Sequence, residues 1–205
     1  MNNIVRRVDL RPTDPSDRMS FARRLQAAFA LAVTDHGPRS DVPTPSDREV
    51  FASFDDAASE VLDVVAKGEV VGGAVVAGDD DRRSLELFFI DAGAHGRGLG
   101  RTAWHAVEAR YPDTGIWETH TPHFEVRNIH FYVNVCGFHI VEFFHPGHPL
   151  EHPGEAQADE DHSPEVDEDV PELMFRFEKV MPRAVRMPGP PGRPSAWPTI
   201  DRACL

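Results

Sequence analysis

The chain has 205 residues, of which 40% are hydrophobic, and a formal net charge of −13. This length and composition suffice for one sizeable hydrophobic core, so we expect one domain at 1–181 followed by a proline-rich tail at 182–205. Ten of the acidic residues lie at positions 151–172, which contain no Lys or Arg. The acidic balance, together with the lack of a basic stripe, argues against a nucleic-acid-binding protein.

Targeting and metal-binding signals are both weak. Cys136 and Cys204 are the only cysteines, and no apolar stretch suits a signal peptide or a membrane span, so we expect a cytoplasmic protein without membrane contact. His145, His148 and His152 lie close together, but prolines interrupt them and no cysteine is near. We therefore predict no metal.

The first half of the chain predicts helices followed by an antiparallel meander. Apolar residues recur at helical spacing in two stretches and alternate or cluster as β-rich runs in four others. The pair Lys67-Gly68 predicts a tight turn between two of these runs, and residues 78–83 form the next predicted turn. The predicted helices are 17–33 and 46–54, and the predicted strands are 4–10, 60–66, 69–77 and 84–90.

A glycine-rich turn at 95–100 joins the apolar strand 84–90 to a helix that ends before Tyr111. Such a turn leaves the first amides of the helix unpaired, with the positive end of the helix dipole behind them, so the turn suits an anion such as phosphate. The third glycine of a dinucleotide fingerprint is replaced by Arg101, and the Gly-Lys of a P-loop is absent. The sequence therefore disfavours both of those nucleotide sites.

The second half predicts a strand at 114–119, a helix at 124–136 and strands at 137–144 and 172–181. Between the last two strands, residues 145–171 are rich in Pro, His and acids, which is typical of a mobile excursion. Asn128 and Tyr132 are four residues apart and share one face of the predicted helix.

These features resemble the GCN5-related N-acetyltransferase (GNAT) superfamily. Residues 95–100 match its motif A, a Gln or Arg, two residues, Gly, one residue and Gly or Ala, except that His95 stands at the first position. Asn128, Tyr132 and the pair 137–138 resemble the Asn, Tyr and Gly-Phe pattern of its C-terminal half. The resemblance implies an α+β fold of three α/β/α layers, with a mixed, mostly antiparallel sheet of six to seven strands and a splayed central strand pair.

The resemblance also implies acetyl-CoA as acyl donor and an amine as acceptor, the latter not readable from the sequence. The pantetheine arm would run between residues 88–90 and 117–119, and Glu86 and Glu118 are candidate general bases. Tyr132 is the candidate general acid, although five positions separate it from Gly137 where many relatives have four. That extra residue could rotate the phenol unless it lies at the helix end. The expected cofactor-binding residues are Phe89, Ile90, His95, Gly96, Arg97, Gly98, Leu99, Gly100, Arg101 and Asn128.

Two classes of function remain open at this point. The first is an acetyl-CoA-dependent N-acetyltransferase acting on a primary amine of a small molecule or a protein. The second is a non-catalytic acyl-CoA-binding regulatory module that keeps the fold and contacts partners through its acidic and proline-rich segments. The sequence is compatible with a homodimer in either case.

Overall fold

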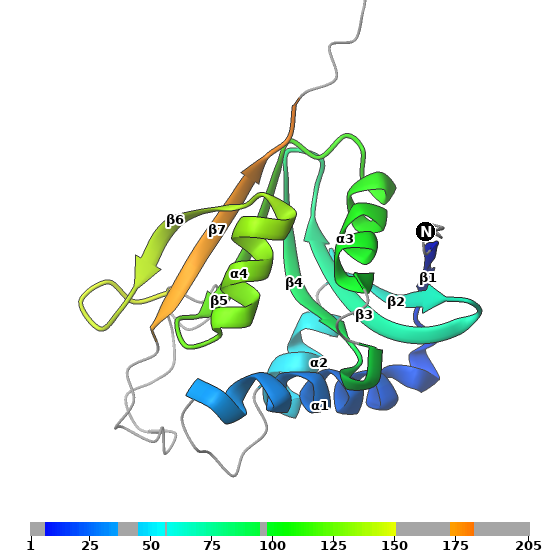
Figure 1. Cartoon of the computed structure of the whole chain (residues 1–205). Helices are drawn as coiled ribbons and strands as arrows, with labels where there is room; N and C mark the ends of the chain where they lie inside the picture. The colour runs from blue at the N-terminus through cyan, green and yellow to red at the C-terminus, as the bar shows by residue number, and fades with distance from the viewer. Residues whose placement is uncertain (1–6, 37–44, 56, 95–97, 151–172, 183–205) are drawn as a thin grey trace, which may run out of the picture.

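A computed structural model of the chain describes residues 7–36, 45–55, 57–94, 98–150 and 173–182, without the side chains of 31–36. Within these residues seven strands form one mixed sheet in the order β1-β2-β3-β4-β5-β7-β6 (Figure 1). All neighbouring strands are antiparallel except β4 and β5, which are parallel. The strands are β1 Val8–Pro12, β2 Glu60–Ala66, β3 Glu69–Gly78, β4 Arg82–Ile90, β5 Ile116–Pro122, β6 His139–Phe144 and β7 Met174–Val180.

Helices cover both faces of the sheet and complete a three-layer α+β fold. In Figure 1, α3 and α4 lie in front of the sheet, and α1 and α2 run along its lower edge and its other face. Each face has its own apolar core, one centred on Trp104 and Trp117 beneath α3 and the other on Phe21 and Phe89 beneath α1. The helices are α1 Arg18–His36, α2 Asp47–Asp55, α3 Leu99–Arg110 and α4 Val126–His130, which continues into the π-helical turn η3 Phe131–Cys136.

Local sequence explains several of these elements. Lys67 and Gly68 both have positive φ, 56° and 84°, the conformation of the type I′ turn that joins twisted strands into a tight hairpin. Ser46 and Glu49 form a reciprocal capping box at the start of α2, with Glu49 Oε2 accepting from the Ser46 amide at 2.6 Å. Asp91, just after β4, is bound by both Arg24 Nε and Nη2, which ties α1 to the end of the central strand.

The structure corrects the ends of two predicted strands. The first strand continues to Pro12, since pairing with β2 extends to Leu62 opposite Pro12, and residues 4–6 lie outside the described part of the chain. The strand predicted at 114–119 runs instead to Pro122, because its whole length pairs with β7. Proline is tolerated there as the last strand residue. The excursion and the tail lie almost wholly outside the described residues.

Candidate acyl-CoA site

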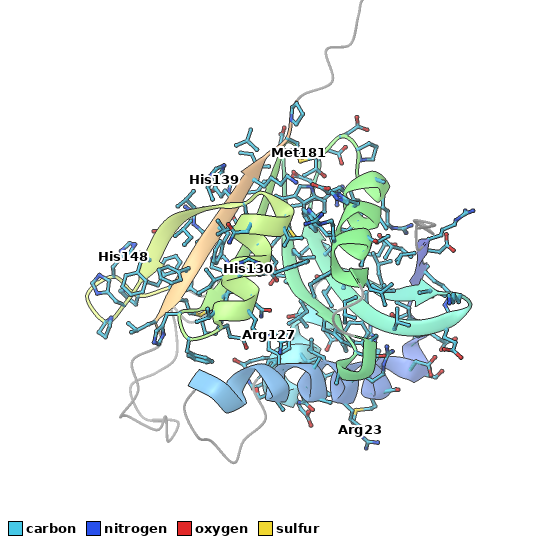
Figure 2. All side chains as sticks on the ribbon, viewed as in Figure 1. Arg23, Arg127, His130, His139, His148 and Met181 are labelled. Carbon is cyan, nitrogen blue, oxygen red and sulfur yellow. The ribbon has the colours of Figure 1, made fainter. Side chains whose placement is uncertain are left out.

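An open cavity of about 780 Å³ lies beside the end of β4, beyond its pairing with β5. It is bounded by the end of β4, the first turn of α3, the α4–η3 segment and α1. Figure 2 shows Arg127 at the end of α4 that approaches α1, with His130 one turn further along. The lining residues are Ala28, Phe29, Phe88, Phe89, Ile90, Ala94, Gly98, Leu99, Gly100, Arg101, Glu125, Val126, Arg127, Asn128, His130, Phe131 and Val135.

The cavity depends on the divergence of β4 and β5. Their parallel pairing covers only three residue pairs and ends at Ser84 opposite Glu118. Just beyond it, Thr119 Oγ1 donates to the Leu85 carbonyl at 2.9 Å, so a side chain substitutes for the next main-chain bond. The predicted splayed pair is confirmed, with one correction. Trp117 and Glu118 belong to the paired part, so the segment opposite residues 88–90 begins after them.

The first turn of α3 forms one end of the cavity. Gly98 precedes the helix in the left-handed region, with φ of 72°, and no side chain caps the helix start. A Cβ added to Gly98 would meet nothing within 4 Å, and Gly98, Leu99 and Gly100 all line the cavity. With Arg101 in the same wall, this end suits an anion. His95, Gly96 and Arg97 lie outside the described residues, so their expected contacts remain predictions.

Two aromatic rings form an apolar wall between the strand and helix sides. Phe88 of β4 and Phe131 of η3 stack with ring centroids 5.7 Å apart and an interplanar angle of 10°. A Cβ on Gly100 would lie 3.2 Å from the Phe131 ring, so this glycine lets α3 approach η3 closely. The predicted residues Phe89, Ile90, Gly98, Leu99, Gly100, Arg101 and Asn128 thus all line one cavity.

A buried carboxyl group, which the sequence analysis missed, lies in the same wall. Glu125 is only 2% exposed, and Asn128 Nδ2 donates to its Oε2. Burial raises its pKa to about 7, while the Asn128 hydrogen bond and the charge of Arg127 act in the opposite direction. The one signal in the sequence is a glutamate directly after a strand break and three residues before Asn128.

Known proteins match the chain both in sequence and in fold. The profile of the acetyltransferase (GNAT) family matches residues 25–138, and a Bacillus subtilis (strain 168) protein called "uncharacterized protein YrkN" is 45% identical over 169 residues. That alignment covers 81% of this chain and 89% of the relative. The chain belongs to the GNAT acetyltransferase family.

Solved structures of other GNAT proteins share the fold at low sequence identity. The ribosomal-protein-S18-alanine N-acetyltransferase of Escherichia coli has a TM-score of 0.59 at 14% identity, covering 87% of this chain and 97% of that protein. A Bacillus subtilis acetyltransferase in complex with CoA has a TM-score of 0.55 at 17% identity, covering 86% and 99%. At these identities the likeness shows the fold alone.

The GNAT tyrosine, Tyr132, lies behind the cavity wall in the apolar core. It is 5% exposed and packs against Phe138 and Phe177, each with its ring centroid 5.7 Å away. Burial raises the pKa of the phenol, and a hydrogen bond with Thr119 offsets part of that rise. The extra residue before Gly137 is absorbed by the π turn η3, in which the Gly137 amide donates to the Tyr132 carbonyl five positions back. The extra residue between Tyr132 and Gly137 therefore lies at the helix end.

The two predicted carboxylates, Glu86 and Glu118, do not line the cavity. Glu86 is exposed and is the extra residue of a β-bulge, because its neighbours Leu85 and Leu87 pair with the consecutive residues 76 and 75. Glu118 Oε2 accepts from Arg82 at 2.5 Å and from Arg176 at 3.4 Å.

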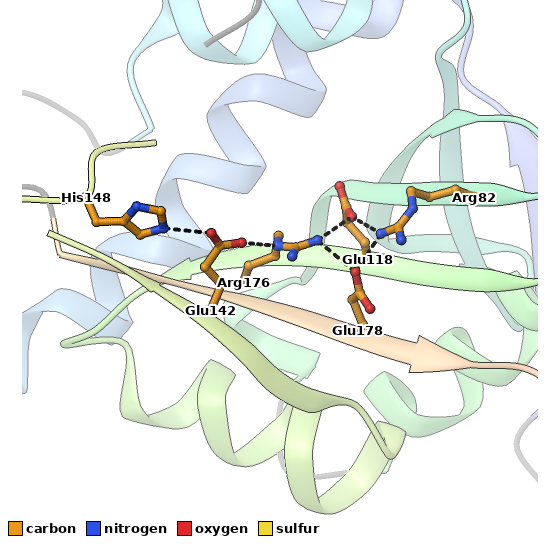
Figure 3. Close-up of polar contacts among 6 residues, drawn as sticks. All are labelled: Arg82, Glu118, Glu142, His148, Arg176 and Glu178. Atoms are coloured by element: carbon orange, nitrogen blue, oxygen red, sulfur yellow. Dashed lines mark hydrogen bonds and ion pairs between the residues drawn. The ribbon is translucent and has the colours of Figure 1, made fainter. Parts of the chain in front are cut away.

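Glu118 belongs to a chain of ion pairs that crosses four strands (Figure 3). Arg82 and Arg176 both also bind Glu178 Oε1, at 2.6 and 2.7 Å. Arg176 continues to Glu142, whose second oxygen contacts His148 Nε2 at 2.7 Å. These contacts join β4, β5, β6 and β7. The network therefore links the two halves of the sheet near the short segment in which β4 and β5 pair.

A second residue missed from the sequence is His120, two positions after Glu118 on β5. Its Nε2 is buried and has no hydrogen-bond partner in the described part of the chain. Burial lowers the pKa of the imidazole despite the nearby Glu118 and Glu86, so the ring is uncharged near neutral pH. The predicted strand ended at residue 119, so the sequence did not place His120 on a strand beside Glu118.

The described residues contain neither a cluster of metal-binding side chains nor a helix that could span a membrane. Among these, no group of three or more His, Cys, Asp or Glu side chains is arranged to hold a metal ion. His145 and His148 form a small turn after β6, while His152 lies outside the described ranges. None of the described helices combines the length and apolar character needed to cross a membrane.

Proposed function

We propose that the protein transfers the acetyl group of acetyl-CoA to a primary amine of a small molecule or a protein, by direct attack of the amine on the thioester. The observation that carries the proposal is the cavity, which joins the start of α3 to the end of β4, beyond the point where β4 and β5 separate. Family membership supports the reaction class.

The cavity wall has the chemistry that an acyl-CoA requires. Within the described part of the wall the charged residues are Arg101, Arg127 and Glu125, and the raised pKa of Glu125 keeps part of that carboxyl neutral near pH 7. The wall is therefore positive on balance and suits the phosphates of CoA. We assign the pyrophosphate to the amides at Gly98–Arg101 and the pantetheine arm to the strip between β4 and Asn128.

The reaction needs an uncharged amine, a group that accepts its proton and a group that protonates the departing thiolate. Tyr132 remains our candidate for the acid, because it lies one helical turn after Asn128. Glu86 and Glu118 remain candidates for the base. Two guanidinium groups donate to Glu118 Oε2, which makes this carboxylate a weaker proton acceptor. Glu86 is therefore the better base of the two.

Acetyl-CoA binding is tested by placing a negative charge at the helix start. Gly98→Asp is expected to weaken binding at least tenfold, about 1.4 kcal/mol, because its carboxylate would face the pyrophosphate. Gly98→Asn is the matched control, since asparagine has the same shape, tolerates positive φ equally well and carries no charge. Isothermal titration calorimetry of both variants checks this. Equal affinity of the two variants for acetyl-CoA would contradict the assignment of the anion site.

The alternative of a non-catalytic acyl-CoA-binding module is favoured by one observation, namely that Tyr132, Glu86 and Glu118 are not among the residues that line the cavity. A thiol-release assay with acetyl-CoA and a panel of primary amines separates the two functions. Amine-dependent release of CoA supports the transferase, whereas tight binding without release supports the module.

A further inference from the structure

We propose that Glu125 is the general base of the reaction and accepts the proton of the attacking amine. This inference rests on the proposed acetyl transfer and concerns the one carboxyl group among the described residues of the cavity wall.

The geometry of the wall leaves few groups that could accept a proton. Among the described lining residues only Glu125 and His130 can do so near neutral pH. The His130 side chain is exposed and its Nδ1 contacts Asn134, one turn further along the helix. Glu125 is instead buried in the wall, close to the start of α4 and the end of β5. A base in this position is shielded from bulk water.

Asn128 holds the carboxyl in place. Its Nδ2 donates to Glu125 Oε2, and both residues line the cavity. One oxygen is therefore fixed by the helix that carries it, and we assign the amine proton to the other oxygen, Oε1. Asn128, which was predicted to contact the cofactor, acquires a second role as the residue that orients the base.

The electrostatic surroundings match this task. Burial dominates and raises the pKa of Glu125 to about 7, where a base is most effective at neutral pH. The charged or titratable groups around the cavity are Arg127 on the same helix, whose charge acts against the rise, His130 and Arg101 elsewhere in the wall, and the buried Tyr132 phenol. Binding of an anionic CoA beside this carboxyl raises its proton affinity further.

The proton and electrons balance without another reactant. The amine nitrogen forms a bond to the acetyl carbon while Oε1 of Glu125 takes the nitrogen's proton. The carbon–sulfur bond then breaks, and its electron pair leaves with sulfur as the thiolate of CoA. That thiolate is protonated by water or by Tyr132, which then regains a proton from solvent, and Glu125 returns its proton to solvent when the products leave.

The experiment compares Glu125→Gln and Glu125→Asp with the wild-type full-length protein. Gln keeps an oxygen for the Asn128 hydrogen bond but cannot accept a proton, whereas Asp keeps the chemistry on a shorter side chain. Glu108→Gln is the control, since Glu108 is a partly buried carboxylate on α3 that pairs with Lys179 and does not line the cavity. CoA release from acetyl-CoA is followed from pH 5.5 to 9 with cadaverine as acceptor and with water alone, because a general base activates either nucleophile.

We expect Glu125→Gln to lower kcat by about 10²- to 10⁴-fold at pH 7.5. The variant should also lose the rise of kcat/KM with pH around pH 7, which we call the limb of the profile. Its Kd for acetyl-CoA should stay within about threefold of wild type. Glu125→Asp should recover part of the rate and the limb, and Glu108→Gln should match wild type. A merely structural role would change the rate but would leave the limb in place.

Two results would overturn the inference while leaving acetyl transfer intact. One is an unchanged limb and rate in Glu125→Gln that still binds acetyl-CoA. The other is loss of the limb in Glu86→Gln or Glu118→Gln alone. Infrared difference spectra of wild type and Glu125→Gln bound to acetyl-CoA add a test that needs no turnover, since a carboxyl that titrates near its ordinary value would exclude this base. Absence of acetyl-CoA binding in wild type would instead refute the proposed function itself.

Discussion

At the scale of single residues, the environments of Tyr132 and Glu125 differ sharply although both lie on one helical segment. Glu125 reaches the cavity, while the Tyr132 ring is enclosed by Phe138 and Phe177 and its hydroxyl bonds to Thr119. Thr119 in turn bridges the splay by donating to the Leu85 carbonyl. The phenol is thus linked by two hydrogen bonds to the point where β4 and β5 separate.

Tyr132→Phe tests this role, because it deletes only the hydroxyl and keeps the ring in the core. If the phenol protonates the thiolate, turnover should fall by about 10² to 10⁴ while the acetyl-CoA dissociation constant changes little. Tyr111→Phe is the control, since the only other tyrosine bonds to Glu60 away from the cavity. Steady-state rates and calorimetry measure the two quantities. Full turnover in Tyr132→Phe would mean that water or another group supplies the proton.

At the scale of elements, close packing between α1 and the sheet fixes the far wall of the cavity. Phe21 of α1 meets Phe54 and Phe89 edge to face, with centroids 5.2 and 5.1 Å away. Its ring lies directly over Gly73 of β3, where an added Cβ would come within 2.2 Å of Phe21 Cε2. Glycine at this position is what allows α1, with its cavity residues Ala28 and Phe29, to lie so near the sheet.

Gly73→Ala should therefore destabilise the fold by about 1–3 kcal/mol, because Phe21 is clamped by two other rings and cannot move aside without strain. Gly93→Ala is the matched control, since a Cβ there meets nothing within 4 Å. Chemical denaturation of both variants gives the free energies of unfolding. Equal stability of the two would show that the core around Phe21 repacks freely.

Much of this architecture could be predicted from the sequence because its patterns are local. Helical spacing in 17–33, the hairpin around Lys67 and Gly68, and the glycine turn before α3 each depend on neighbouring residues alone. The confirmed likeness to GNAT proteins then supplied the sheet and the splayed pair.

The parts that could not be predicted depend on contacts between distant segments. Glu125 is part of a cavity wall because residues of α1, β4 and α3, which are distant in the sequence, line the same cavity. Pairing with β7 carries β5 past His120, and that partner lies more than 50 residues away in the sequence. The five-residue spacing from Tyr132 to Gly137 was visible, but whether a helix absorbs it as a π turn is decided by packing.

At the scale of the whole molecule, the ionisable groups have opposite effects on how stability changes with pH. Hydrogen bonds from Arg82 to Glu178 and from His148 to Glu142 hold the pKa of those carboxyls below the ordinary value, so their contribution to stability is lost as the pH falls through the native-state pKa. Glu125 behaves in the opposite way, since its native pKa is raised from 4.5 to about 7. The native state then binds more protons than the unfolded state between these values, and stability falls as the pH rises through that window.

Glu125→Gln isolates the contribution of Glu125 to the pH dependence of stability, because the variant and the wild type differ only in this titrating group. Below about pH 3.5 the carboxyl is largely protonated in both native and unfolded wild type, so the variant should have nearly the same free energy of unfolding there. Between pH 4.5 and 7 the variant should become progressively more stable than wild type, and above pH 7 the difference should level off at roughly 3 kcal/mol, since each pKa unit corresponds to about 1.4 kcal/mol. Urea denaturation at closely spaced pH values measures the curve. A constant difference across the range would mean that Asn128 and Arg127 already stabilise the charged carboxylate, whereas the predicted rise would show a group kept in the wall at a cost in stability, as a functional site often requires.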